Sequence, residues 1–355
     1  MSQANFLLIQ SSMTKTNAID GKPAKLLHLT NQHGMTATFM DIGATWLSCT
    51  LPVNKEHREI LLRSLNMEEH IKQTAYFGSV VGRYANRISR GKFSINSKPY
   101  KITINDGDNS LHGGVNGFDK RRWTIESSRE NSVTFSLYSK DGDQGYPANL
   151  QVKVTYTLTN DNELVIDYFA KSDSNCPVNL TNHAYFNLAG EQSNAKSLDH
   201  TLQMHADHYL PTHDDLIPTG ELRAVKSTSF DFNQEKKIGA EFLSEQDQKI
   251  AGGYDHAFIF NKKLTNGEAT VVTLTSPEKE VSMRVSTTKP AIQFYSGNFL
   301  AETPGASKIY QNYDGLALET QYLPDGPNHS EWGESSGILS AEATYQHQTT
   351  YQFEF

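Results

Sequence analysis

Apolar and polar residues alternate along much of the chain. The pattern is clearest over residues 151–159, where Val152, Val154, Tyr156 and Leu158 alternate with glutamine, lysine and threonine. A period of two places successive side chains on opposite faces of a strand. This segment is therefore predicted to be a β-strand with one buried face and one face in water.

Turn-forming residues separate this segment from others like it. The Asn-Asp-Asn sequence at 160–162 favours a turn, and residues 164–170 resume with β-branched and aromatic side chains. Such a pair is typical of an antiparallel hairpin, which residues 133–138 extend to a meander. Further strands are predicted over 270–275, 281–285, 291–295 and 345–355. The chain is thus predicted to be all-β.

Few segments favour a helix. The candidates are short, at 67–73 and 238–248, and the second is only weakly amphipathic. Parallel sheets need a crossover helix between successive strands, so this scarcity favours antiparallel sheets. No linker, low-complexity tract or repeat divides the chain. We therefore predict one large antiparallel β-sandwich with few short helices, in which residues 1–355 form a single domain.

Composition and charge exclude several classes of function. Apolar residues make up 37% of the chain, enough for a buried core. Lysine and arginine number 32 against 40 acidic residues, a net charge of -8, and no basic stripe is interleaved with aromatics. We therefore expect no nucleic-acid partner. Without a signal-peptide pattern or an apolar run of about 20 residues, we expect a cytoplasmic protein without a membrane partner.

The two cysteines, Cys49 and Cys176, are far apart and lack CxxC spacing. This argues against a disulfide framework and a structural zinc site, and predicts two reduced, partly buried thiols. The histidines and aspartates between 205 and 215 resemble a metal cluster only superficially, because they straddle a strand and a proline turn. No metal site and no cofactor are predicted.

Chemically capable residues gather where strand sequence passes into glycine- and asparagine-rich turns, which is where a sheet scaffold displays function. These segments supply histidines, carboxylates, an arginine, amides and phenols. A neutral polyhydroxylated ligand needs such donors and acceptors beside an aromatic wall. A sugar fits this inventory better than a phosphate. The segments are GRYANRI (82–88), LHGG (111–114), NLTNHAYFN (179–187), GYDHAF (253–258), IQFYSGN (292–298) and GLALET (315–320).

The ordered set of these segments resembles the galactose mutarotase (aldose 1-epimerase) family. The resemblance runs from about residue 38 to 332, and it also includes DGDQGYPANL, YLPTHDDLIPTG and QYLPDGPNH. Any one block is a weak signal, whereas their common order is specific. The resemblance implies a large β-sandwich called a supersandwich. It also implies an isomerase that interconverts the α and β anomers of free aldoses such as D-galactose and D-glucose.

The same resemblance implies roles for individual residues. His183 matches the family's general acid and Glu319 its general base. Tyr185, two residues beyond His183, is expected to line the same pocket. The positions that match sugar contacts are Asn86, Arg87, His112, Asp255 and Gln293.

Ring opening of a hemiacetal needs a base for the C1 hydroxyl proton and an acid for the ring oxygen. We expect Glu319 to act as a carboxylate and His183 as an imidazolium, whose ordinary pKa of about 6.5 lies near the working pH. Each positioned acid or base typically contributes about 10² to 10⁴ in rate.

Other functions stay open on the sequence alone. Asp255 and Glu319 could flank a glycosidic bond, as in a glycosidase. A non-catalytic sugar-binding protein would need no matched acid and base. A hexose-phosphate epimerase would need grouped cations, for which only Arg83 and Arg87 are candidates. The preferred sugar, and the choice between monomer and homodimer, are not determined by the sequence.

Overall fold

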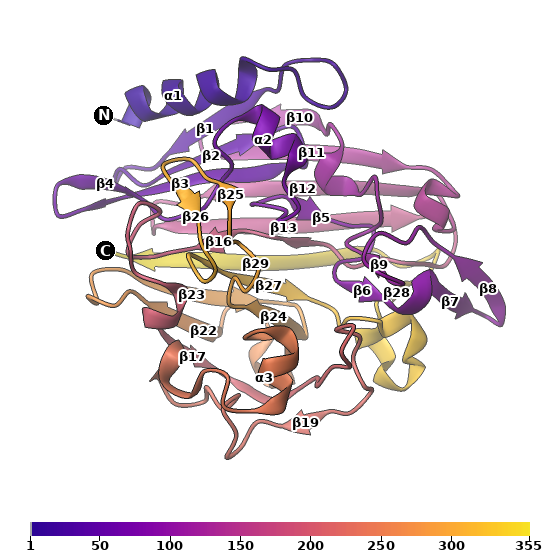
Figure 1. Ribbon diagram of the computed structural model, residues 1–355. Helices are drawn as coiled ribbons and strands as arrows, with labels where there is room; N and C mark the ends of the chain where they lie inside the picture. Colours follow the sequence, from indigo (N-terminus) through magenta and orange to yellow (C-terminus); the bar gives the residue numbers. More distant parts are fainter. Residues whose placement is uncertain (1) are drawn as a thin grey trace.

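The computed structural model describes residues 2–355 as stacked antiparallel sheets (Figure 1). The largest sheet has nine strands. In spatial order they are β10 (Thr124–Ser128), β11 (Ser132–Ser139), β12 (Leu150–Leu158), β13 (Glu163–Ser172), β29 (Tyr345–Glu354), β23 (Ser282–Thr287), β22 (Thr270–Thr275), β17 (Thr201–Met204) and β20 (Lys236–Lys237).

Two further sheets lie against the nine-stranded sheet. The four-stranded sheet is β1 (Leu26–Thr30), β2 (Thr36–Met40), β3 (Thr45–Val53) and β4 (Glu56–Glu59). The six-stranded sheet has the order β16 (Tyr185–Phe186), β27 (Leu316–Gln321), β24 (Ala291–Tyr295), β21 (Asp255–Phe260), β18 (Ala206–Tyr209) and β19 (Arg223–Ala224).

Short strand pairs connect the large sheets. They are β5 (Val80–Val81) with β15 (Thr181–Asn182), β6 (Arg87–Ile88) with β9 (Ser110–Leu111), β7 (Lys92–Ile95) with β8 (Lys98–Lys101), β14 (Cys176–Pro177) with β28 (Ile338–Leu339), and β25 (Thr303–Pro304) with β26 (Ile309–Tyr310). Of the candidate site described below, Arg87 lies on β6, His112 directly follows β9 and His183 directly follows β15.

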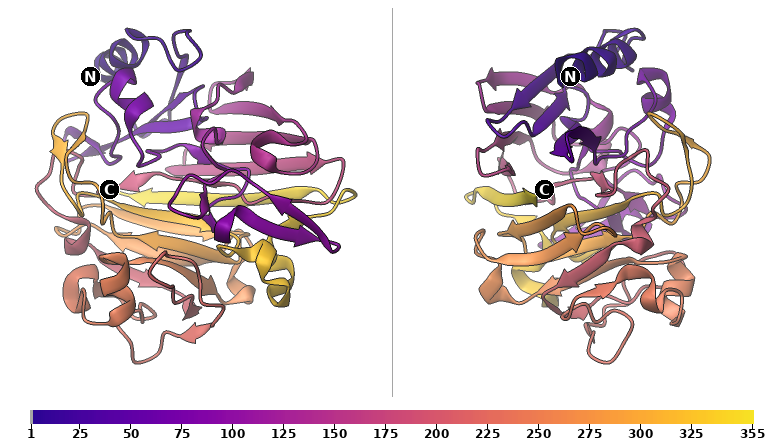
Figure 2. Two further views of the ribbon diagram at one scale, coloured as in Figure 1. Left: turned by 45° about the vertical axis from the view of Figure 1, so that its right-hand side comes forward. Right: turned by 90° about the vertical axis from the view of Figure 1, so that its left-hand side faces the viewer.

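The main core lies between the sheets, which Figure 2 shows in two further views. The Tyr351 hydroxyl of β29 donates to the Leu318 carbonyl of β27 at 3.1 Å. On the four-stranded sheet, Trp46 packs against Phe186 and Tyr351, with ring centroids 5.7 and 5.6 Å away. Apolar faces of all three sheets thus share one interior, as two packed layers require.

The predicted all-β fold is confirmed. On β12, inward residues such as Val154 are buried whereas Lys153 and its outward neighbours are exposed or half-buried. The meander β11–β12–β13 and the later hairpin β22–β23 pair in antiparallel register. The closing strand β29 lies between β13 and β23. That position depends on non-local pairing, which the alternation could not predict.

The helices agree with the sequence only in part. The predicted helix at 67–73 is confirmed as α2 (Met67–Lys72), whose N-cap Asn66 accepts the Glu69 N–H. The prediction at 238–248 is wrong. That stretch holds a 3₁₀ turn, Ile238–Glu241, and only the start of α3 (Gln246–Ala251), because Leu243 has a φ of 55° and interrupts helical geometry.

The sequence analysis missed α1 (Ser2–Thr14). Ile9 and Met13, four residues apart on one face, are buried against Met40 and Leu47, while Leu8 is exposed. The helix lacks a broad apolar stripe, so its periodicity was weak. Among residues 2–355, no helix has the length and apolar character to cross a bilayer. Both cysteines are buried free thiols, as predicted.

Ile166 offers a test of the predicted core face. Its side chain is fully buried on β13, between β12 and β29. Ile166→Ala should lower the free energy of unfolding by about 2–5 kcal/mol, because a cavity remains in a packed interior. Lys153→Ala, on the outward face of β12, should change it by less than about 0.5 kcal/mol. Urea unfolding measures both, and equal losses would contradict this placement of the core.

Candidate active site

One face of the six-stranded sheet carries four of the predicted site residues, namely Tyr185, Asp255, Gln293 and Glu319. The register pairs Gln293 of β24 with Glu319 of β27, and Asp255 of β21 with Tyr295 of β24. Opposite residues of an antiparallel pair share a face. The other face of β27 turns to the core, where the Thr320 hydroxyl contacts that of Thr349 at 2.6 Å. Strand pairing therefore gathers these polar side chains away from the core.

His183 is fixed beside this face by its own backbone. It directly follows β15, and its N–H donates to the Ser79 carbonyl at 2.9 Å while its carbonyl accepts from Gly78 at 2.8 Å. Tyr185, two residues on, lies on β16 opposite Ala317 of β27. The short strands β15 and β16 thus hold His183 and Tyr185 against the strand that carries Glu319.

Arg87 and His112 come from the β6–β9 pair. The His112 N–H donates to the Asn86 carbonyl at 3.1 Å, and the Asn86 N–H donates to His112 Nδ1 at 3.1 Å. Because Nδ1 accepts, the ring proton of neutral His112 is on Nε2. Arg87 donates through Nε to Asp106 at 2.8 Å. His112 can therefore donate from Nε2, while an anchored Arg87 supplies positive charge.

The predicted site residues surround one cavity of about 170 Å³. Gln293 is the exception: it is not among the lining residues, and it donates from Nε2 to Asp255 Oδ1 at 2.6 Å. The cavity is lined by Thr74, Ala75, Tyr76, Asn86, Arg87, Leu111, His112, His183, Tyr185, Asp255, Tyr295, Phe299, Thr303 and Glu319. Seven of the eight predicted site residues thus line one cavity.

Several lining residues were missed, chiefly Tyr76, Tyr295, Phe299 and Thr303. Tyr295 belongs to the IQFYSGN segment, and Tyr76 lies within the stretch 38–332 that carries the resemblance, six residues before GRYANRI. The proximity of these two tyrosines to the recognised motifs was the signal that could have identified them. They supply the aromatic wall expected of a sugar pocket.

His183 and Glu319 form the central pair. His183 Nε2 lies 3.5 Å from Glu319 Oε1, and both side chains are buried. Within residues 2–355, neither His183 Nδ1 nor Glu319 Oε2 has a hydrogen-bond partner. Unsatisfied buried polar atoms are costly, and a native structure keeps them chiefly where function requires them.

Burial moves both pKa values toward the uncharged forms. It lowers the pKa of His183 to about 4. Burial also raises the pKa of Glu319 well above its usual range, with Asp255 adding to the rise and the Arg87 guanidinium opposing it. Burial therefore favours a neutral His183 and a protonated Glu319 in the sugar-free pocket. The imidazolium expected of His183 is thus disfavoured while the pocket holds no sugar.

The spacing of three side chains would also suit a metal ion. His112, His183 and Glu319 offer ligand atoms within 4.8 Å of one another. A neutral histidine that binds a metal through Nε2 carries its proton on Nδ1. In His112, Nδ1 instead accepts the Asn86 N–H. Metal binding would break that bond, so the trio fits a proton-transfer site better than a metal centre.

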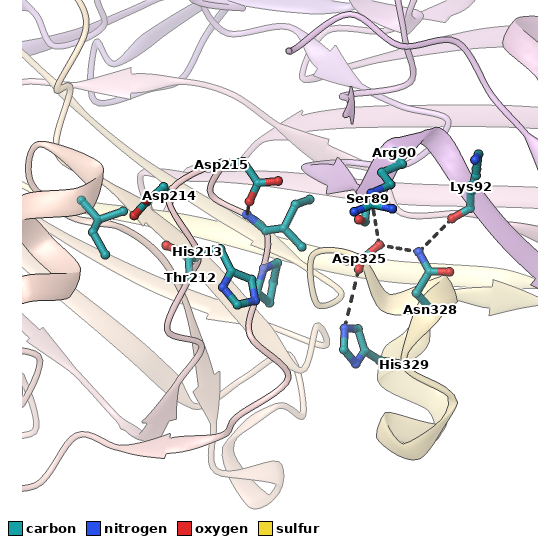
Figure 3. A pocket seen from close by; sticks show the side chains of 13 residues that line it. Ser89, Arg90, Lys92, Thr212, His213, Asp214, Asp215, Asp325, Asn328 and His329 are labelled. Carbon is teal, nitrogen blue, oxygen red and sulfur yellow. Dashed lines mark hydrogen bonds and ion pairs between the residues drawn. The ribbon is translucent and has the colours of Figure 1, made fainter. Parts of the chain in front are cut away.

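A wider groove of about 950 Å³ borders the site, and Figure 3 shows its walls. No predicted site residue is among its described lining residues. Its Asp325 supports the site from outside: the carboxylate accepts the Ser89 N–H at 2.9 Å, and the Asp325 N–H donates to the Arg87 carbonyl at 2.7 Å. One wall of the groove therefore fixes the strand that carries Arg87.

Comparison with known proteins identifies the family of the chain. Residues 25–352 match the family model described as aldose 1-epimerase. The chain belongs to the aldose 1-epimerase family. Family membership, predicted from the ordered motifs, is thereby confirmed. The matched range contains all eight predicted site residues, whereas α1 lies outside it.

Proteins named for this activity match most of the chain and most of their own length. A Haemophilus influenzae protein named aldose 1-epimerase is 47% identical over 341 residues, covering 96% of this chain and 98% of the relative. The galactose mutarotase of Sus scrofa is 40% identical, covering 83% and 84%. The crystal structure of galactose 1-epimerase from Lactobacillus acidophilus superposes with a TM-score of 0.82 at 30% identity, covering 94% and 96%. The predicted mutarotase-like fold is confirmed.

Proposed function

We propose that this protein interconverts the α and β anomers of a free aldose, with D-galactose and D-glucose as substrates. The observation that carries the proposal is the His183–Glu319 pair, 3.5 Å apart, buried, and with one atom of each unpaired. A matched acid and base at the wall of a small polar cavity suits ring opening of a sugar hemiacetal.

Glu319 and His183 would carry one proton between them. As the sugar binds, its anomeric hydroxyl donates to the Glu319 carboxylate, and its ring oxygen accepts from His183 Nε2–H. Glu319 takes the hydroxyl proton, His183 gives its proton to the ring oxygen, and the C1–O5 bond breaks to give the aldehyde. Rotation about C1–C2 and the reverse transfers then close the other anomer.

The state of the pair before reaction follows from its burial. In the empty pocket burial favours the neutral form of His183 and the protonated form of Glu319. The nearby Arg87 guanidinium lowers the pKa of Glu319 and so favours the ionised carboxylate. A bound sugar adds hydroxyl donors to that carboxylate, which shifts the proton to His183. The reactive form therefore arises when substrate is in place.

The remaining predicted residues would orient the sugar. Arg87, held by Asp106, and Asp255, held by Gln293, present fixed groups to the hydroxyls. His112 donates from Nε2, because Asn86 occupies its Nδ1. Tyr185 forms part of the aromatic wall. We propose that residues 1–355 act as one unit, since the site draws on strands throughout the sequence.

A phosphorylated sugar is a poorer substrate for this site. Within residues 2–355, Arg87 is the one guanidinium or ammonium group that lines the cavity. Arg83, the other candidate, is buried and donates to the carbonyls of Pro147 and Ala148 at 2.6 and 2.9 Å. A phosphate would thus meet one cation beside two carboxylates, which is unfavourable.

Polarimetry of freshly dissolved α-D-galactose and α-D-glucose tests the proposal. The protein should speed the approach to anomeric equilibrium, and EDTA should leave the rate unchanged, because the pair needs no metal. The equilibrium rotation itself must not change. A folded protein that accelerates neither sugar over buffer would overturn the proposal for these substrates, and binding without acceleration would point to a sugar-binding role.

A further inference from the structure

Tyr76 makes contacts that the proposed reaction has not used. Its ring lies 5.7 Å from the His183 ring, centroid to centroid, at an interplanar angle of 26°. Tyr185 lies 5.0 Å from the same ring at 29°. Both tyrosine rings lie beside the imidazole at shallow interplanar angles, so together they restrain its plane.

The backbone of Tyr76 is strained at this position. Its φ of 58° is in the left-handed region, which a bulky aromatic residue rarely adopts. Such strain persists only where the surrounding structure imposes it, and it gathers at functional sites. A residue kept in this conformation beside the central pair is a candidate for a role in the reaction.

Tyr76 and His183 are joined through the same turn. The Ser79 N–H donates to the Tyr76 carbonyl at 3.0 Å, which closes the turn. The backbone of this turn also binds His183, through Gly78 and Ser79. Glycine is required at 78, because a Cβ there would lie 2.0 Å from the Trp46 carbonyl oxygen. The ring of Tyr76 and the backbone of His183 are therefore set by one rigid segment.

Four groups face the His183 ring. They are Glu319 from β27, His112 after β9, Tyr185 from β16 and Tyr76 itself. Tyr76 also packs against His112, with centroids 4.6 Å apart. Burial raises the pKa of Tyr76, so its phenol stays neutral. Tyr76 thus acts on His183 by shape and by exclusion of water, without a charge of its own.

We propose that Tyr76 is a positioning residue: together with Tyr185 it fixes the plane of the His183 imidazole so that Nε2 faces Glu319, and it shields that ring from water. The inference rests on the proposed function, in which His183 passes a proton to the ring oxygen. A free imidazole ring could rotate out of line, and misplacement by about 1 Å can cost roughly 100-fold in rate.

The test compares Tyr76→Phe, which keeps the ring, with Tyr76→Gly, which removes it and adopts a positive φ without strain. Tyr313→Gly is the matched control, because Tyr313 also has a positive φ, of 68°, but packs on Phe242 outside the cavity lining. Polarimetry with α-D-galactose gives kcat and KM. NMR titration of the histidine rings, assigned with His183→Asn, gives the pKa of His183.

Tyr76→Gly should lower kcat about 10- to 100-fold, more than it changes KM, and should move the pKa of His183 up from about 4 toward its ordinary value. Tyr76→Phe should retain both properties. Tyr313→Gly should lower the melting temperature without either effect. Wild-type kcat and an unchanged His183 pKa in folded Tyr76→Gly would overturn the inference, as would equal losses in Tyr76→Phe. If the wild-type protein lacks activity, the proposed function fails, while the NMR titration still tests whether Tyr76 shields His183.

Discussion

Glu319→Gln should abolish most of the mutarotation while leaving the protein folded. The amide matches the carboxylate in size but cannot take the anomeric proton. Because a positioned base contributes about 10² to 10⁴ in rate, kcat should fall by that factor. Polarimetry with α-D-galactose measures the loss. Sugar binding, followed by calorimetry, should survive, because Arg87 and Asp255 remain in the cavity.

The same variant has an expected effect on stability. The pKa of Glu319 is raised in the folded state, so its contribution is favourable at low pH and is lost as pH rises through that raised value. Glu319→Gln carries no charge to bury, so it should be at least as stable as the wild type at alkaline pH.

Glu59→Gln is a matched control for this variant. Glu59 is half-buried and also has a raised pKa, but it accepts from the backbone of Cys49 and Leu61 outside the cavity. The Glu59→Gln variant should therefore be less stable than the wild type and keep the wild-type kcat. Full activity in Glu319→Gln would show that Glu319 takes no part in the reaction.

His183→Asn should lower kcat by a similar factor, about 10² to 10⁴, because the ring oxygen loses its proton donor. Asparagine keeps a hydrogen-bond donor but cannot accept and return a proton. His200→Asn is the matched control: His200 is also buried, with its pKa lowered to about 4, but its Nε2 accepts the Leu188 N–H away from the cavity. The control should be less stable yet catalytically normal. Equal kcat losses in the two variants would show a general packing effect instead.

The pH profile of kcat/KM gives a further signature of His183. If the active pair holds one proton, activity is lost as pH falls through about 4, where His183 takes a second proton. Since that pKa lies below the ordinary 6.5, the stability that neutral His183 contributes is complete above pH 6.5 and is lost as pH falls toward 4. The residual activity of His183→Asn should lack this acid limb.

Much of the fold could be predicted because its signals are local. The alternation at 151–159 reports one face of β12 in water and the other in the core, whatever the partner strands are. Turn residues fixed the hairpin to β13. The helix at 67–73 carried its own N-cap. The weakly amphipathic stretch at 238–248 led to a wrong helix prediction, because Leu243 takes a backbone conformation that composition does not reveal.

The site was predicted by a different route. Residue types at strand ends indicated a sugar, and the order of the motifs indicated the family. Neither source located Tyr76, whose importance depends on rings from three separate segments meeting at His183. The assignment of Gln293 to sugar contact stays a prediction; the structure shows its amide donating to Asp255, which orients that carboxylate.

By itself, the sequence determined the strand content and the family and predicted the acid–base pair, because alternation and ordered motifs depend on residues near one another in the chain. Tertiary structure alone decided that β29 lies between β13 and β23, and that Glu319 faces His183 at 3.5 Å. It also decided which protonation state is favoured for His183 and for Glu319 in the empty pocket. Burial by distant strands lowers the pKa of His183 and raises that of Glu319, and desolvation is a property of the folded surroundings.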